Sequence, residues 1–311
     1  MGNVLLQSIE VPNEHLLAER LTAQLSDRLP PGSVISPWKR GADYAAFRVR
    51  SPDRRMVLRV PLREQAQSAY DGVTDFGAVL RREVTAHRVL TDAGVPMAPL
   101  YDWHRAGHNH EHSWMLLAEV EHDGLTELGE QELAELGATL ARIHHVTPHA
   151  SDAELLAADC TAQALADRVA VRVGALAERA RVPGHDSVIE AARSILKTRD
   201  TGDRLLHMDL RPDNLCYRDA RLAAVLDLSN CTTGDPAAEL GRMKAYGLLH
   251  GALIGAYRAG GHELPDETVI AAYATDTFAL LGLLGTDEFA DQELVCRGVN
   301  GLAWCRSVLC R

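Results

Sequence analysis

The chain has 311 residues, 46% of them hydrophobic, and a formal net charge of −11. This length and apolar content are enough for two packed lobes or one large domain with a real core, and they exclude a disordered chain. The negative charge argues against a nucleic-acid partner, because phosphate backbones need a basic surface. It favours cationic ligands instead, although an acidic surface can also serve solubility alone.

The sequence predicts a cytoplasmic protein without a membrane span. The first ten residues have no basic start and no long apolar core, so they are not expected to form a signal peptide. Apolar runs such as residues 248–256 are too short to cross a bilayer. The six cysteines lack C-x-x-C or zinc-type spacing, which predicts free thiols in a reducing compartment. A link between Cys305 and Cys310 is the alternative.

The N-terminal part of the chain predicts one helix and then a small antiparallel sheet. Leucines and alanines recur at helical spacing over residues 13–28, behind Asn13 as the candidate N-cap. Short alternating segments separated by turn sequences then predict three strands. These segments are residues 33–38, 44–50 and 56–60. The polar stretch between Pro61 and Gly77 is expected to be a mobile insertion.

A helix over residues 78–90 and two more strands complete this part of the chain. The strands are expected at 97–103 and 113–120, with residues 104–112 as their connecting hairpin. Histidines stand at positions 104, 108, 110 and 112 of that hairpin. They are expected to be an exposed polar loop, and a transition-metal site is the alternative.

From Glu130 onward the apolar residues follow a helical period. Helices are expected over residues 130–145, 151–180, 186–196, 237–259, 266–284 and 287–309. Between the third and fourth of these, a strand beginning near Arg204 is expected to lead into a polar loop. Asp235 and Pro236 predict the N-cap and first residue of the fourth helix.

The stretch from Leu205 to Asp227 contains the densest chemistry in the chain. It reads as a short apolar strand, a polar loop, and a hairpin whose apolar run 222–226 ends at a carboxylate. The polar residues of the loop alone could belong to an ordinary turn. The position of Asp227 directly after the hairpin favours a catalytic site. The polar residues of interest are His207, Asp209, Arg211, Asn214 and Asp227.

These side chains are the groups that phosphoryl transfer requires. Asp209 could accept the proton of an attacking hydroxyl. Asn214 and Asp227 carry hard oxygen atoms suited to Mg²⁺, which binds one or two protein carboxylates together with substrate phosphates. Arg211 could stabilise negative charge on the transferred group.

The sequence H-M-D-L-R-P-D-N at 207–214, followed by Asp227, resembles the catalytic loop of protein-kinase-like enzymes. The later sequence D-L-S-N-C-T-T-G-D-P at 227–236 is similar to that of the aminoglycoside phosphotransferase and choline kinase branch, and not to the Asp-Phe-Gly of protein kinases. The resemblance covers nearly the whole chain. It implies a two-lobed α+β fold, with a small antiparallel-sheet N-lobe over residues 1–119 that binds nucleotide and a mainly helical C-lobe over 120–311 that binds substrate.

The resemblance also implies roles for residues outside the loop. Arg59 on the third strand would hold the α- and β-phosphates of ATP, with Glu83 as its partner, although a surface ion pair is the alternative. Backbone groups near Glu119 and Val120 would pair with adenine at the hinge. The expected glycine-rich loop is reduced to Gly41.

Two further residues are expected to support the loop. The resemblance assigns the bracing of the catalytic loop to Asp235, in addition to its capping role. His207 is expected to brace the same loop through hydrogen bonds.

The expected function is transfer of a phosphoryl group from ATP, or GTP, to a hydroxyl of a small cationic molecule in the presence of Mg²⁺. An antibiotic kinase that acts on an aminoglycoside or a basic peptide, for resistance or self-protection, is favoured within the resembling branch. Kinases of macrolides, of nucleoside antibiotics, or of choline, homoserine or fructosamine remain alternatives. A nucleotide-binding pseudokinase without activity is the alternative from another class.

Overall fold

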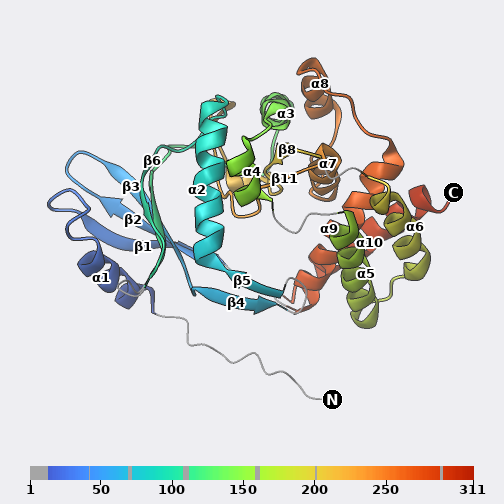
Figure 1. Ribbon diagram of the computed structural model, residues 1–311, viewed down its shortest axis with the longest axis horizontal. Helices are drawn as coiled ribbons and strands as arrows, with labels where there is room; N and C mark the ends of the chain where they lie inside the picture. Colours follow the sequence, from blue (N-terminus) through green and yellow to red (C-terminus); the bar gives the residue numbers. More distant parts are fainter. Residues whose placement is uncertain are drawn as a thin grey trace, which may run out of the picture. The chain divides into compact units, whose positions relative to one another are not determined.

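The computed structural model describes residues 13–41, 43–68, 72–107, 112–157, 162–199, 202–287 and 290–311 (Figure 1). The chain forms two compact units. The first contains the described residues up to Val84 and Ala98–Val120, and the second contains Thr85–Met97 and Glu121–Arg311. The chain therefore crosses between the units three times, once within a helix, whereas the sequence suggested a single boundary after Glu119.

A five-stranded antiparallel sheet with strand order β1-β2-β3-β7-β6 forms the centre of the first unit. Alternate side chains on its strands, such as Phe47 and Leu58, are fully buried against leucines of helix α1. Asn13 caps that helix as predicted, and its side chain accepts the His15 N–H at 2.9 Å. The elements are α1 (Glu14–Gln24), β1 (Val34–Arg40), β2 (Tyr44–Arg50), β3 (Arg55–Pro61), β6 (Leu100–His104) and β7 (Trp114–Ala118).

The polar stretch after Pro61 forms a hairpin, which the sequence did not predict. Strand β4 (Gln65–Ser68) pairs antiparallel with β5 (Gly72–Asp75), and helix α2 (Phe76–Asp92) follows at once. The Glu64 carboxylate accepts the backbone N–H and the hydroxyl of Ser113, both at 2.8 Å, and so ties the hairpin to β7. None of the side chains described in β4 and β5 is buried. The hairpin therefore lacks the apolar alternation by which strands are recognised.

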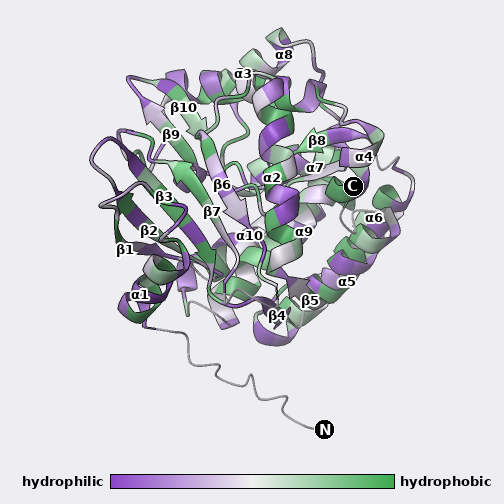
Figure 2. Cartoon of the chain, turned by 60° about the vertical axis from the view of Figure 1, so that its left-hand side comes forward, coloured by the Kyte–Doolittle hydropathy of each residue, from purple (hydrophilic) through white to green (hydrophobic). Residues whose placement is uncertain are grey.

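The second unit is mainly helical, as expected. Hydrophilic and hydrophobic residues alternate around helix α5 (Figure 2). Two predicted helices are each divided into two: residues 151–180 form α4 and α5, and residues 237–259 form α7 and α8. Helix α7 ends at Ala245 because Gly247 follows in the left-handed region at φ 75°. The helices are α3 (Glu130–His145), α4 (Ala150–Leu156), α5 (Ala162–Arg179), α6 (His185–Lys197), α7 (Pro236–Ala245), α8 (Gly251–Ala259), α9 (Glu267–Asp287) and α10 (Gln292–Leu309).

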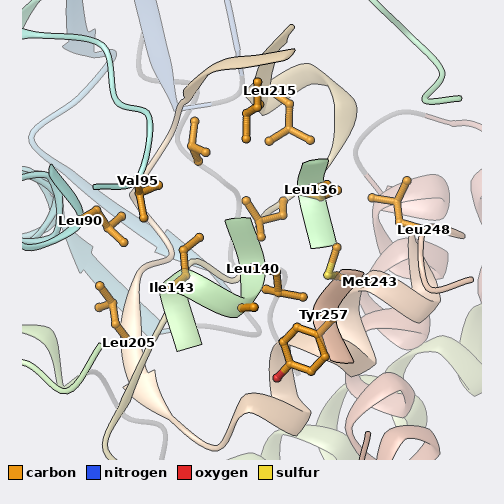
Figure 3. Packing of buried hydrophobic residues seen from close by; sticks show 14 of the residues in the cluster. Leu90, Val95, Leu136, Leu140, Ile143, Leu205, Leu215, Met243, Leu248 and Tyr257 are labelled. Atoms are coloured by element: carbon orange, nitrogen blue, oxygen red, sulfur yellow. The ribbon is translucent and has the colours of Figure 1, made fainter. Parts of the chain in front are cut away.

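The core of the second unit fixes both ends of the predicted catalytic loop. Leu205 before the loop and Leu215 after it are buried in one apolar cluster with residues of α3 and α7 (Figure 3). Leu210, inside the loop, belongs to the same cluster and is 1% exposed. Each such leucine contributes about 1.5–3 kcal/mol of burial free energy, so the apolar residues anchor the loop while its polar residues remain available.

Helix α9 corrects the expectation that the apolar runs of the chain are all too short to cross a bilayer. Its 21 residues are long and apolar enough to cross a membrane, but 72% of the apolar window is buried inside the fold. It packs against α7, where a Cβ on Gly241 would lie only 2.7 Å from the Cβ of Tyr273. Within the described residues, α9 is therefore best understood as a core helix.

The described cysteines are free thiols, as predicted. Burial raises the pKa of Cys305 to about 12, and Cys310 is exposed and unlinked to it. Cys160 lies outside the described residues. The free cysteines are Cys216, Cys231, Cys296, Cys305 and Cys310.

Candidate active site

The strand, loop and hairpin predicted from Leu205 to Asp227 are present. Strand β8 (Arg204–Leu206) enters the loop, and a single 3₁₀ turn (Pro212–Asn214) leads to β9 (Leu215–Arg218) and β10 (Arg221–Val225). Asp219 and Ala220 join these strands with φ values of 51° and 58°, as a two-residue hairpin of the primed type requires. Strand β11 (Thr232–Gly234), which the sequence did not predict, pairs back with β8.

Asp209 lies at the centre of the loop with its carboxylate held from several sides. The residue is 8% exposed. Its Oδ2 accepts the Asn214 Nδ2–H at 2.9 Å, and its Oδ1 accepts the hydroxyl of Tyr246 at 2.8 Å. A carboxylate held this firmly has a defined direction in which it can accept a further proton.

Arg211 is the exposed cation of the loop. Its side chain is 46% exposed and lies 3.4 Å from Oδ2 of Asp209 and 3.2 Å from Oδ2 of Asp213. Burial alone would lower the pKa of Arg211, but the two carboxylates outweigh that effect and raise it. The guanidinium therefore stays charged, and its exposure allows it to reach an anionic group.

The side-chain amide nitrogen of Asn214 bonds within the loop. Its Nδ2 donates to both the backbone oxygen and Oδ2 of Asp209, each at 2.9 Å. Both amide hydrogens are thus used within the loop. Asn214 is 6% exposed, and its backbone oxygen accepts the Leu226 N–H at 2.8 Å. This bond brings the end of β10, and Asp227 after it, to the catalytic loop.

Asp227 adopts an unusual backbone conformation. Its φ is 58°, in the left-handed region that residues other than glycine rarely occupy. Ser229 orients the side chain, donating to Oδ1 of Asp227 from its backbone N–H at 3.3 Å and from its hydroxyl at 2.7 Å. Strain of this kind concentrates at functional sites.

The donor set fits magnesium. An amide oxygen at 214 and a carboxylate at 227 are hard ligands, and Mg²⁺ takes its remaining ligands from phosphates and water. Among the described residues, no three His, Cys, Asp or Glu side chains gather to hold a metal by themselves. In the histidine hairpin, His104 stacks on Trp114, with ring centroids 6.0 Å apart. Positions 108 and 110 lie outside the described residues, so the metal alternative there stays a prediction.

His207 links the loop to the end of β10. It is fully buried; its Nδ1 accepts the Asp209 N–H at 3.2 Å, and its Nε2 lies 3.0 Å from the Leu226 oxygen. Because a backbone N–H can only donate, Nδ1 must be the acceptor, and Nε2 carries the hydrogen that it donates. These contacts support a bracing role for His207.

Glu239 is the main residue that the sequence prediction missed. It is 1% exposed, and its carboxylate accepts the backbone N–H of His207 at 3.0 Å and of Met208 at 2.7 Å. The second of these residues has φ 66°, so the bonds hold a strained backbone. Glu239 also lies 3.0 Å from Nε2 of His144.

The resemblance implied that Asp235 braces the catalytic loop, but the hydrogen bonds of Asp235 go to other parts of the chain. Its Oδ1 accepts the Ala237 N–H at 2.9 Å and caps α7, as predicted. Its Oδ2 accepts from Arg199 at 2.9 Å and from the hydroxyl of Tyr273 at 3.1 Å. Asp235 therefore fixes the start of α7, and Glu239 on that helix holds the loop.

One face of α7 and the residue that follows it contact three successive loop residues. Glu239 accepts from His207 and Met208, Arg242 donates to the Met208 oxygen, and Tyr246 donates to Asp209. The spacing 239, 242, 246 places these side chains on the same side of the helix. The spacing is visible in the sequence, but polar residues at such positions usually face solvent.

In the first unit, Arg59 and Glu83 form an ion pair as predicted. Glu83 is buried and Arg59 is partly buried, with side-chain exposures of 2% and 14%, so the pair is not an exposed surface ion pair. The guanidinium carbon of Arg59 lies 3.6 Å from the ring centroid of Tyr44, whose hydroxyl donates to Glu83 Oε1 at 3.1 Å. The sequence did not predict a role for Tyr44. Together with Glu83, it holds the Arg59 guanidinium in place on β3.

Glu119 and Val120 lie where the chain leaves the first unit. The carboxylate of Glu119 pairs with Arg48 at 3.2 Å and with Arg50 at 2.7 Å. Its backbone N–H donates to the Arg55 oxygen at 3.1 Å. That N–H is thus used within the sheet. The pairing of backbone groups near Glu119 and Val120 with adenine stays a prediction.

Comparisons with known proteins agree with this arrangement. None of the curated proteins matches the sequence, but solved structures share the fold. A Ralstonia eutropha protein described as an aminoglycoside phosphotransferase has a TM-score of 0.66 and 16% identity, with 93% of this chain and 98% of that chain covered. Spectinomycin phosphotransferase APH(9)-Ia with ADP and spectinomycin has a TM-score of 0.63 and 12% identity, with 94% of each chain covered.

A thermostable mutant of aminoglycoside phosphotransferase APH(4)-Ia, in complex with ADP and hygromycin B, has a TM-score of 0.61 and 14% identity; 94% of this chain and 97% of that chain are covered. These likenesses confirm the predicted kinase-like α+β fold. A family model described as the phosphotransferase enzyme family matches residues 34–273. The chain belongs to the phosphotransferase enzyme family.

Proposed function

We propose that this protein transfers the γ-phosphoryl group of ATP to a hydroxyl of a small molecule. The observation that carries the proposal is the arrangement of Asp209 and Asn214, bonded to one another, with the chain at Asp227 brought to them through Leu226. In the reaction, the acceptor oxygen bonds to the γ-phosphorus while the bond from phosphorus to the bridging oxygen breaks and ADP leaves. The proton of the acceptor hydroxyl goes to the Asp209 carboxylate.

The residues of the site divide the remaining tasks. Asn214 and Asp227 would hold Mg²⁺, which neutralises charge on the phosphates when bound. Arg211 would neutralise charge on the transferred group. In the first unit, Arg59, fixed by Glu83 and Tyr44, would hold the nucleotide phosphates, and backbone groups beyond Glu119 would contact the base.

The favoured acceptor is a cationic antibiotic, with resistance or self-protection in the cytoplasm as its purpose. Two observations support this choice. The net charge of −11 attracts cations, and structures with the same fold hold hygromycin B or spectinomycin beside ADP. GTP is the alternative phosphoryl donor.

A panel of acceptors tests the proposal. Hygromycin B, spectinomycin, a macrolide, a basic peptide antibiotic, choline and homoserine are incubated separately with Mg²⁺ and ATP or GTP. Mass spectrometry then detects the addition of one phosphate. Phosphorylation of choline or homoserine alone would indicate a metabolite kinase, and nucleotide binding without any phosphorylated product would indicate a pseudokinase.

The variant Asp227→Asn is expected to weaken Mg²⁺-dependent ATP binding by about 10-fold or more, because the cation loses a charged ligand. Asparagine is the suitable replacement, since it tolerates the left-handed backbone at φ 58°. The measurement is a calorimetric titration of ATP with Mg²⁺ and again with EDTA.

Asp219→Asn is the matched control, because Asp219 has φ 51° but lies at the tip of the β9–β10 hairpin. It should leave the titration unchanged. An Asp227→Asn protein with the Mg²⁺ dependence of the original protein would reject Asp227 as a ligand.

A further inference from the structure

Tyr246 offers an inference about how the acceptor is engaged, which rests on the phosphotransfer function proposed above. The residue follows the last turn of α7 and is half-buried. Its hydroxyl donates to Oδ1 of Asp209 at 2.8 Å. No motif in the sequence indicated this contact, because Tyr246 lies 37 residues from its partner.

The hydrogen bonds to Asp209 can be counted oxygen by oxygen. An ionised carboxylate has about four lone-pair sites, two on each oxygen. On Oδ2, one faces Asn214 Nδ2 at 2.9 Å and the other faces Arg211 Nε at 3.4 Å. On Oδ1, one accepts from Tyr246. Within the described part of the chain, about one site remains, and it lies on Oδ1.

We propose that Tyr246 is the positioning residue for the acceptor: its hydroxyl fixes Oδ1 of Asp209 so that the remaining lone pair of this oxygen receives the acceptor proton. The acceptor hydroxyl then lies beside the Tyr246 hydroxyl, and both donate to one carboxylate oxygen. As the acceptor oxygen bonds to phosphorus, its hydrogen moves to Oδ1, and Tyr246 keeps its own hydrogen.

The electrostatics of the site agree with a tyrosine that only donates. Burial raises the pKa of Tyr246, Arg242 opposes this, and Asp209 adds to the increase, with a result of about 12. The hydroxyl therefore remains protonated throughout the physiological range. Arg242 also donates to the Met208 oxygen, so the helix end that carries Tyr246 is tied to the loop at a second point.

The test is the variant Tyr246→Phe, which removes one hydroxyl and keeps the ring. With the acceptor of the panel that is phosphorylated fastest, kcat should fall about tenfold, the effect of losing one hydrogen bond to a charged group in the transition state. The KM for ATP should stay within about twofold, because the nucleotide does not contact this oxygen in the proposed step. Incorporation of 4-aminophenylalanine at position 246 restores a donor and should recover most of kcat.

Tyr273→Phe is the matched control. The Tyr273 hydroxyl also donates to a carboxylate oxygen, Oδ2 of Asp235 at 3.1 Å, but this carboxylate caps α7. The control should keep its kcat, and thermal unfolding of each variant shows whether it is folded.

The outcomes separate the inference from the function on which it rests. An unchanged kcat in folded Tyr246→Phe, while Asp209→Asn is inactive, would overturn the positioning role and leave the phosphotransferase intact. An equal loss in the Tyr273→Phe control, or no rescue by 4-aminophenylalanine, would also overturn it. An active Asp209→Asn, or a panel without any product, would reject the proposed function and the inference together.

Discussion

Replacing Asp209 by asparagine is expected to lower kcat about 10²- to 10⁴-fold, the usual contribution of a general base. The change removes the charge and keeps the shape of a side chain that is 8% exposed and bonded to Asn214, Arg211 and Tyr246. Alanine at the same position should give a similar loss, but it would also leave the amide of Asn214 without one of its acceptors. Asparagine is therefore the cleaner test.

The affinity for ATP should survive this change. Asp209 is assigned to the acceptor hydroxyl, and the nucleotide is assigned to Arg59, Asn214 and Asp227. The measurements are kcat with the fastest acceptor and a titration with ATP and Mg²⁺. Asp203→Asn is the control: its side chain is 70% exposed just before β8 and should leave both quantities unchanged. Undiminished transfer by the Asp209→Asn variant would contradict the proposed mechanism.

The parts of the fold that are specified locally could be predicted from the sequence. Asn13 and Asp235 cap their helices as expected, because each cap is a contact over two residues. Strand β2 was predicted with its observed bounds, since apolar residues alternate along it. The loop from His207 to Asn214 was recognised for the same reason: its groups lie within eight residues of one another.

The missed features depend on residues that are distant in the sequence. Glu239 is a first-turn acid of α7, and only the fold shows that it faces the N–H groups of residues 207 and 208. Strand β11 has three residues, and its pairing with β8 becomes visible only once the loop is in place. None of the side chains described in the β4–β5 hairpin is buried, so the periodic signal is absent there. These features therefore depend on contacts within the folded structure and not on the local sequence of the segment.

Glu239→Gln is expected to reduce both stability and activity. The carboxylate accepts two backbone N–H groups and the Nε2–H of His144, and the amide group of glutamine would place a donor against one of these donors. Leaving a buried donor unpaired and removing a buried charge should lower the free energy of unfolding by about 3 kcal/mol. Displacement of the loop by about 1 Å would lower kcat roughly 100-fold.

Urea unfolding and steady-state kinetics measure these two effects. Glu293→Gln is the matched control, because Glu293 also lies in the first turn of a helix but is exposed. It experiences a similar helix dipole, so any difference between the variants comes from the bonds of Glu239 to the loop. Equal stability of the two variants would contradict the bracing role.

The pH dependence gives a second test of the same residue. Burial alone would raise the pKa of Glu239, but the hydrogen bond and proximity of His144, together with the hydrogen bond from the backbone N–H of His207, outweigh burial, and the pKa is lowered from 4.5. A lowered pKa in the folded state means that the ionised form stabilises the fold above the unfolded-state value, and this stabilisation is lost as the pH falls through the folded-state value. The difference in unfolding free energy between the original protein and Glu239→Gln should therefore be constant above about pH 6 and shrink at pH values below 4.5. A difference that stays the same from neutral to acidic pH would show that the charge of Glu239 does not hold the loop.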